Sequence, residues 1–208
     1  MRLPSTQALG RLRRMGKTVL TTSDAALHLG LSRPAATRML GRLASAGLAL
    51  RLRHGLWSLD PGIEPMLLVE HLTAPFPAYV SLQSALHLHG MISQVPQVIY
   101  VASLAPTKRI ATAVGHYSIH RLAPSFSGGF ESTPAGIRLA TPEKALRDVL
   151  YLGPARSHLF AALPEVELPA GFSPTKARRW LTKVPPGPRH TMIERRLRAF
   201  LRGARRPR

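Results

Sequence analysis

Residues 20–59 read LTTSDAALHLGLSRPAATRMLGRLASAGLALRLRHGLWSL, and this stretch decides the fold of the first part of the chain. A first helix is predicted to begin at a capping Thr22 or Ser23, with Asp24 in its first turn, and to end at Gly30. Hydroxyl side chains accept hydrogen bonds from the free amides of a first turn, and glycine adopts the left-handed conformation that often follows a last turn. The stretch therefore opens with a short capped helix.

A second helix follows after a very short turn. Ser32 is its predicted N-cap, Pro34 lies in its first turn, and Gly47 closes it. Two residues, Gly30 and Leu31, separate the first helix from this N-cap. A tight turn that contains glycine is typical of a helix-turn-helix, so the two helices are predicted to form that motif.

Strand-like residues flank the helix pair. LALRLR (48–53), a turn at His54 and Gly55, and LWSL (56–59) predict a β-hairpin, and KTVL (17–20) is a candidate third strand beside it. A hairpin directly after a helix-turn-helix is the wing of a winged helix. We therefore predict a winged helix-turn-helix domain that binds DNA.

The second helix separates apolar from basic residues. At about 100° per residue, the side expected to face the core carries Ala36, Met39, Leu40, Leu43 and Ala46. The start of this helix meets the bases in the motif, so base reading is predicted for Arg33, Thr37 and Arg38. Phosphate contacts are predicted for Arg42 of the helix and for Arg51, Arg53 and His54 of the wing. The alternative is that these arginines form a solvated helix face and nothing more.

Composition points to the same class of partner. The chain carries 29 Lys and Arg against 10 Asp and Glu, a formal net charge of +19. The excess lies in residues 1–60 and 151–208, while residues 61–150 are almost balanced. An uneven basic charge indicates a polyanionic partner at both ends of the chain.

Two further features bound the class of protein. The chain has no cysteine, which excludes disulfides and thiolate zinc sites. No apolar run approaches membrane-spanning length, and the basic N-terminus lacks the apolar segment of a signal peptide. We therefore expect a cytoplasmic protein without membrane contact.

The chain is expected to have an α+β fold in two domains. Residues 1–60 form the predicted winged helix, residues 61–78 a linker that includes a short helix at 66–72, and residues 79–208 an α+β domain with a basic helical end. Prolines and glycines at the linker supply the turn residues expected between domains.

Helix and strand patterns can be placed within the second domain. Ser81 is expected to cap a helix that ends at Gly90, and Thr141 to cap a second helix, PEKALRDVLYL. In that second helix, Lys144 and Asp148 are predicted to form an i,i+4 pair on the outside. Strands are expected at residues 97–102, 116–122 and 136–140.

The last third of the chain is predicted to hold two basic helices. TKARRWLTKV (175–184) and TMIERRLRAFLRG (191–203) are separated by PPGP (185–188), and the tail ARRPR (204–208) is expected to be disordered in isolation. A possible second basic surface consists of Lys176, Arg178, Arg179, Arg195, Arg198 and Arg202.

The acidic residues do not indicate an active site. Metal-dependent phosphoryl chemistry needs closely spaced carboxylates, and no such pair lies on a predicted strand. Glu165 and Glu167 form the one E-x-E, are flanked by prolines, and are interpreted as structural or solvated. We expect no catalytic residue and no cofactor, and therefore a protein that is not an enzyme.

The histidines do not predict a metal site either. His87 and His89 lie two apart in a predicted helix and therefore project in different directions. His116 and His120 lie four apart along a predicted strand, roughly 13 Å from end to end. Packing or surface roles are the expected ones.

Two motifs of the second domain add a resemblance. Together with the winged helix, YVSLQSALHLHGMISQVPQVIYVAS (79–103) and LATPEKALRDVLYL (139–152) resemble the AbiEi family, the antitoxin-regulators of bacterial type IV toxin–antitoxin systems linked to phage defence. The resemblance runs in order along nearly the whole chain. It implies that the N-terminal domain binds inverted repeats in double-stranded DNA upstream of its own operon and represses transcription.

The resemblance also implies a role for the C-terminal domain. That domain would neutralise a nucleotidyltransferase-like toxin encoded next door, with or without a stable complex. By matching position, DNA reading falls to Arg33, Thr37, Arg38 and Arg42. The basic segments TKARRWL (175–181) and ERRLR (194–198) are candidates for the antitoxin function.

Two alternatives stay open at the level of sequence. The first is a winged-helix regulator whose second domain senses a ligand or dimerises, with no toxin partner. The second is an enzyme that processes nucleic acid, such as a nuclease with a winged-helix docking domain. The lack of a convincing carboxylate set for metal argues against the enzyme.

Overall fold

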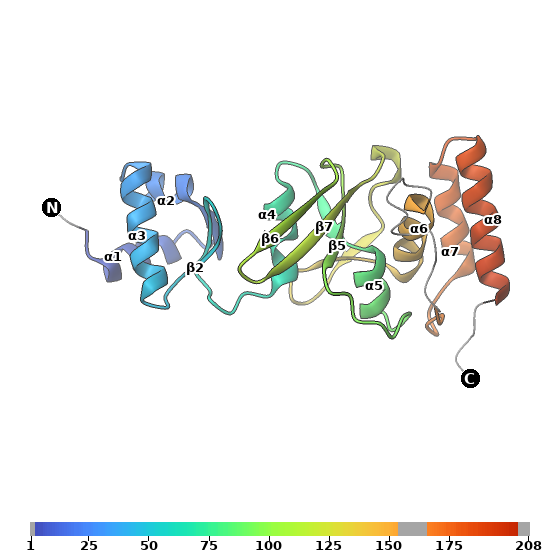
Figure 1. Cartoon of the computed structure of the whole chain (residues 1–208), viewed down its shortest axis with the longest axis horizontal. Helices are drawn as coiled ribbons and strands as arrows, with labels where there is room; N and C mark the ends of the chain where they lie inside the picture. The colour runs from blue at the N-terminus through green and yellow to red at the C-terminus, as the bar shows by residue number, and fades with distance from the viewer. Residues whose placement is uncertain (1–2, 154–165, 204–208) are drawn as a thin grey trace. The chain divides into compact units, whose positions relative to one another are not determined.

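The computed structural model describes residues 3–153 and 166–203, which divide into two compact units. One unit comprises Met1–His71 and Ala111–Gly115, and the other comprises Leu72–Ile110 and His116–Arg208. The architecture is α+β, as expected, with helices and a sheet in each unit (Figure 1). None of the described helices is long and apolar enough to cross a membrane.

The first unit is a winged helix-turn-helix. Its elements in chain order are α1 (Ser5–Arg13), β1 (Val19–Thr21), α2 (Thr22–Leu29), α3 (Arg33–Ser45), β2 (Leu50–Arg53) and β3 (Leu56–Ser58). The three strands form an antiparallel sheet in the order β1-β3-β2, so the predicted strand before α2 does pair with the wing. Leu12, Leu40 and Leu43 are fully buried where the three helices meet beneath this sheet.

The N-cap of α2 differs from the expected one. Thr21 is the cap, not Thr22 or Ser23, and it forms a capping box with Asp24. The Asp24 amide donates to Thr21 Oγ1 at 3.1 Å, and the Thr21 amide donates to Asp24 Oδ2 at 2.8 Å. Thr22 lies inside the helix because its hydroxyl accepts a hydrogen bond from the indole of buried Trp57 at 3.0 Å. A wing residue thereby sets where α2 begins.

The segment between the two sheets is helical in part. It contains a 3-10 turn, η1 (Pro65–Leu68), followed by α4 (Val69–Thr73), in the place where a short helix at 66–72 is expected. The division of the chain at residues 60 and 79 stays a prediction.

The second unit is built on a six-stranded mixed sheet in the order β6-β7-β5-β4-β9-β8. Strands β4 and β9 are parallel, as are β5 and β7, while β4 and β5 are antiparallel. The strands are β4 (Ala78–Val80), β5 (Ile99–Ser103), β6 (Lys108–Thr112), β7 (Gly115–Arg121), β8 (Phe130–Ser132) and β9 (Arg138–Ala140). The helices are α5 (Leu82–Leu88), η2 (Pro124–Phe126), α6 (Pro142–Leu152), α7 (Pro174–Arg179), η3 (Trp180–Lys183) and α8 (Pro188–Gly203).

The expected strands at 97–102, 116–122 and 136–140 correspond to β5, β7 and β9. The sequence gives no comparable signal for β4, β6 and β8. Strands β6 and β8 lie at the two edges of the sheet and are partly exposed, so their residues do not alternate between an apolar and a polar face. Strand β4 has three residues, all buried, too few to show a period.

Helix α6 lies at the centre of the second unit, and this overturns one prediction. The sequence spacing predicts Lys144 and Asp148 on the outside of the helix, yet both side chains are entirely buried. The reason is that α5, β9, α7 and α8 all pack against α6, so that every residue from Glu143 to Leu152 is buried. Amphipathic spacing predicts one buried face and cannot anticipate a helix that is covered all round.

Asp148 also changes the role of Ser81. Ser81 is the N-cap of α5, as expected, but its hydroxyl makes no capping bond. It donates instead to Asp148 Oδ2 at 2.7 Å, since the buried carboxylate needs donors more than the helix end does. Glu165 and the tail at 204–208, for which the sequence makes predictions, lie outside the described residues.

Candidate nucleic-acid interface

Helix α3 presents a basic face opposite the face that packs on the core. Ala36, Met39, Leu40 and Leu43 are buried as predicted, whereas Ala46 is exposed because the helix ends at Ser45. Arg33, Thr37, Arg38 and Arg42 are all exposed. The four predicted helix residues are therefore accessible to a ligand.

The start of α3 is tied to α2. The guanidinium of Arg33 donates to Ser23 Oγ at 2.6 Å, and Thr37 Oγ1 donates to the carbonyl of Arg33 at 3.0 Å. Arg33 thus contributes to the helix-turn-helix geometry, and the Thr37 hydroxyl keeps its lone pairs and methyl group for a base edge.

Arg38 and Arg42 differ in how firmly they are held. Arg42 donates to the sulfur of Met39 at 3.3 Å, which ties its side chain to its own helix. Arg38 is exposed and forms no hydrogen bond or ion pair with any other residue in the described ranges. All the N–H donors of the Arg38 guanidinium are therefore available to a partner.

The wing carries two further exposed arginines, one of which is stacked on an aromatic ring. Arg51 and Arg53 are both exposed and lie on either side of buried Leu52 in β2, where the pairing with β3 shifts its register. The Arg51 guanidinium lies 5.6 Å from the Trp57 ring and 3.4 Å from Nδ1 of His54. Stacking on the indole limits the motion of the Arg51 guanidinium.

This arrangement is a winged helix with an exposed basic α3 and a basic wing. The chain matches the AbiEi antitoxin family here. The match covers residues 7–59 and is to the family described as "Transcriptional regulator, AbiEi antitoxin". It extends from α1 to the end of the wing, about a quarter of the chain, so the resemblance to AbiEi antitoxins is confirmed for the winged helix. No curated protein matches the chain.

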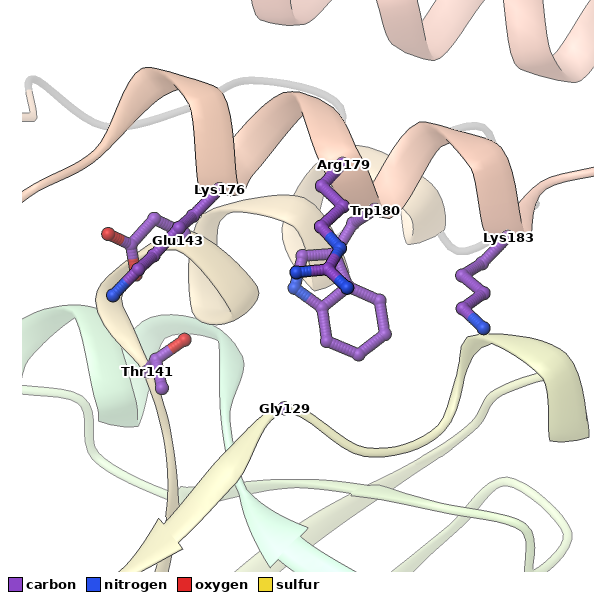
Figure 2. A pocket seen from close by; sticks show the side chains of 7 residues that line it. All are labelled: Gly129, Thr141, Glu143, Lys176, Arg179, Trp180 and Lys183. Carbon is purple, nitrogen blue, oxygen red and sulfur yellow. The ribbon is translucent and has the colours of Figure 1, made fainter.

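Outside the residues of the AbiEi match, four of the six basic residues predicted on the C-terminal helices line two separate cavities. Lys176 and Arg179, together with Lys183, line a cavity of about 350 Å³ (Figure 2). Arg178 and Arg198 line a separate cavity of about 370 Å³ with Glu194, which pairs with Arg198 at 2.8 Å. The remaining two predicted residues, Arg195 and Arg202, are exposed on α8.

The cavity of Figure 2 contains residues that the sequence-based prediction missed. Its other lining residues are Gly129, Thr141, Glu143 and Trp180. Lys183 could have been found, since Lys176, Arg179 and Lys183 lie at i, i+3 and i+7 and so share one helix face. Gly129 and Thr141 come from distant segments and carry no signal of this kind.

Beneath the cavity, Lys144 lies among three aromatic rings. Its ammonium is 4.1 Å from the Phe126 ring centroid, 4.9 Å from that of Trp180 and 5.6 Å from that of Tyr79. It forms an ion pair with Asp148, which also accepts from the hydroxyl of Tyr79 at 3.2 Å. The cation is thus enclosed by π faces and one carboxylate.

Burial dominates the electrostatics of this cluster. It raises the pKa of Asp148 and lowers the pKa of Lys144, because each charged form loses its hydration. Burial, reinforced by the charge of Asp148, also raises the pKa of Tyr79. Neighbouring Arg147 is fully buried, none of its guanidinium nitrogens has a hydrogen-bond partner among the described residues, and burial lowers its pKa to about 10.

Two histidines of the second unit, His89 and His120, have structural partners. His89 Nε2 lies 2.7 Å from the carbonyl of Ala140, and His120 Nε2 lies 2.8 Å from Ser118 Oγ. Within residues 3–153 and 166–203, no group of three His, Asp or Glu side chains could hold a metal ion.

Proposed function

We propose that this chain is a DNA-binding antitoxin that represses its own toxin–antitoxin operon. The observation that supports the proposal most is the accessible face of α3, with Arg38 unengaged, in a winged helix that matches the AbiEi regulators. Arg33, Thr37 and Arg38 would read base edges in an inverted repeat. Arg42, Arg51, Arg53 and His54 would hold phosphates.

The second half of the proposal concerns the second unit. We infer that this unit neutralises a nucleotidyltransferase-like toxin encoded beside the antitoxin gene, as part of phage defence, and that the protein acts in the cytoplasm without catalysing a reaction. The support is the resemblance of residues 79–103 and 139–152 to AbiEi antitoxins. The basic residues of α7 and α8 are the candidate contacts.

Repression is tested by a gel-shift titration of the full chain. The probes are the duplex upstream of its own gene and a scrambled duplex of equal length, each at two salt concentrations. Tighter binding to the upstream duplex that persists at the higher salt supports an autorepressor. Equal binding that collapses with salt would mean that charge alone acts, and it would overturn the proposal.

Neutralisation is tested by co-expression with the neighbouring gene. The full chain should restore growth of cells that the neighbouring gene product arrests, and the double variant Arg38→Ala/Arg42→Ala should still do so while losing repression. Failure of the wild-type chain to restore growth would overturn the antitoxin role. Turnover of labelled DNA in the presence of magnesium would overturn the non-enzymatic role.

A second candidate function is a winged-helix regulator whose second unit senses a ligand. The cavity between α7–η3 and the Gly129 and Thr141 segments favours it, because its volume lies in the range of small-molecule sites. The growth experiment separates the two functions, since a regulator without a toxin restores nothing.

A further inference from the structure

Three basic residues on one side of the α7–η3 segment line a cavity. In Figure 2, the side chains of Arg179 and Lys183 extend from α7–η3 toward the segment that contains Gly129, and the side chain of Lys176 extends beside Glu143. None of the three forms an ion pair with a residue in the described part of the chain. Three cations against the carboxylate of Glu143 leave the lining of this cavity with a net positive charge, which attracts an anion of more than one charge.

Among the described residues that line this cavity, one carries a carboxylate, and that carboxylate already accepts a hydrogen bond. Glu143 is buried and its Oε1 accepts the amide of Ser173 at 2.8 Å, so it joins α6 to the start of α7. Thr141 Oγ1 accepts the Lys144 amide at 3.3 Å and retains its own hydrogen for a ligand. Thr141 is also the N-cap of α6, so the positive end of that helix dipole adds to the field.

Trp180 supplies an aromatic wall that is held in place. Its ring lies edge-on to Phe126, with centroids 6.0 Å apart, and the ammonium of Lys144 lies 4.9 Å from its centroid. At Gly129, where φ is +75°, an added Cβ would collide with the Trp180 ring. The indole can occupy its position because residue 129 has no side chain. A fixed, partly exposed indole offers a planar ring a surface on which to stack.

We propose that this cavity binds a nucleotide through its 5′-phosphate and its base. Lys176, Arg179 and Lys183 hold the phosphate, with Thr141 as an added donor, and Trp180 stacks on the base. A volume of about 350 Å³ suits one nucleotide and excludes a duplex. The 5′-phosphate belongs either to a free mononucleotide or to the end of a single strand. The inference rests on the cavity and does not depend on toxin neutralisation.

Titration calorimetry of the full chain at fixed ionic strength tests this site. The probes are AMP, inorganic phosphate and adenosine. AMP is expected to bind at least about tenfold more tightly than either fragment, because it alone engages both the cations and the indole. Equal affinity for AMP and phosphate would overturn the role of Trp180 and with it the nucleotide. No binding of AMP would overturn the site.

Two triple variants with the same loss of charge separate the cavity from the general basic character of the chain. Lys176→Gln/Arg179→Gln/Lys183→Gln should weaken AMP binding by about tenfold or more. Arg195→Gln/Arg198→Gln/Arg202→Gln, on α8, should leave it within about twofold. Equal losses in both variants would show non-specific charge attraction and overturn the proposal. Thermal unfolding of each variant verifies that it is folded.

A pair of single-stranded tetranucleotides identifies the source of the phosphate. One carries a 5′-phosphate and the other a 5′-hydroxyl. A preference for the phosphorylated strand that the cavity variant loses and the α8 variant keeps supports the end of a strand. AMP binding with no such preference supports a free nucleotide. Equal binding of both strands together with no AMP binding would overturn the site and leave the repressor function untouched.

Discussion

Lys144 and Asp148, one turn apart in α6, form an ion pair in which both side chains are entirely buried. Tyr79 and Ser81 complete the shell of the carboxylate, and three aromatic rings complete that of the ammonium. Burial removes the hydration of both charged groups, and their mutual attraction offsets this cost. If one partner is removed, the other stays buried and charged without a counter-charge, which is strongly destabilising. The pair therefore links α6 to β4, η2 and η3.

Lys144→Met should lower the free energy of unfolding by about 3–5 kcal/mol, because it leaves the Asp148 carboxylate buried without its counter-charge. The measurement is urea unfolding followed by circular dichroism. Lys144→Met/Asp148→Asn should recover part of the loss. The matched control is the exposed i,i+4 pair Glu194–Arg198, where Arg198→Ala should cost less than about 1 kcal/mol. Equal costs at the two pairs would contradict the role assigned to burial.

The same type of substitution should have the opposite sign at Arg147. Its guanidinium is fully buried and has no hydrogen-bond partner in the described part of the chain. Arg147→Met removes a desolvated charge and keeps most of the volume, so we expect a gain in unfolding free energy of about 1–3 kcal/mol. Urea unfolding under identical conditions measures it, and a loss similar to that of Lys144→Met would refute the expectation.

Gly129→Ala should destabilise the second unit and displace Trp180. The residue has φ +75°, and its added Cβ would meet the indole ring. We expect a loss of about 2–4 kcal/mol from overpacking and left-handed strain together. Gly90→Ala is the control, since φ there is +67° and nothing lies within 4 Å of an added Cβ. It should lose less, and tryptophan fluorescence should change in Gly129→Ala alone.

His120 should make stability depend on pH. Burial, with a contribution from the charge of Arg109, lowers the pKa of His120 to about 4. Between pH 6.5 and pH 4 the unfolded chain binds a proton that the folded chain does not, so the free energy of unfolding falls as the pH falls through this range. The expected loss is about 2–3 kcal/mol.

Calorimetric unfolding at pH 4 to 7 tests the effect of His120. The variant His120→Gln keeps a hydrogen-bonding partner for Ser118 and should flatten the dependence. His116→Gln, at an exposed position of the same strand, should retain it. An unchanged slope in His120→Gln would assign the pH dependence to another group.

Arg38→Ala should weaken binding to the upstream duplex by about 1–3 kcal/mol if the side chain makes a bidentate base contact, and it should relax the preference over scrambled DNA. Arg53→Ala is the companion variant in the wing. It should weaken binding to both duplexes equally and reduce the salt dependence, as expected for a phosphate contact. Equal losses of affinity for both duplexes in Arg38→Ala would show that Arg38, like Arg53, contacts phosphate and does not read a base.

The sequence alone determined the winged helix, because its signals are local. The capping residues around α2 and α3, the Gly30 turn and the alternation around Leu52 act within a few residues of one another, and they are present in the unfolded chain. For the same reason the exposed face of α3, with Arg38 and Arg42, could be derived from spacing alone. The exact cap at Thr21 was missed, since Trp57 in the distant wing engages Thr22.

Tertiary structure alone decided the rest. Lys144 and Asp148 have the spacing of an ordinary exposed pair, and what buries them is packing by elements from four other parts of the chain. The cavity likewise needs Gly129, Thr141 and the α7–η3 helix together, and no periodicity connects segments so far apart. Burial of a charge and assembly of a hollow depend on long-range contacts, which are properties of the folded chain and not of any stretch of its sequence.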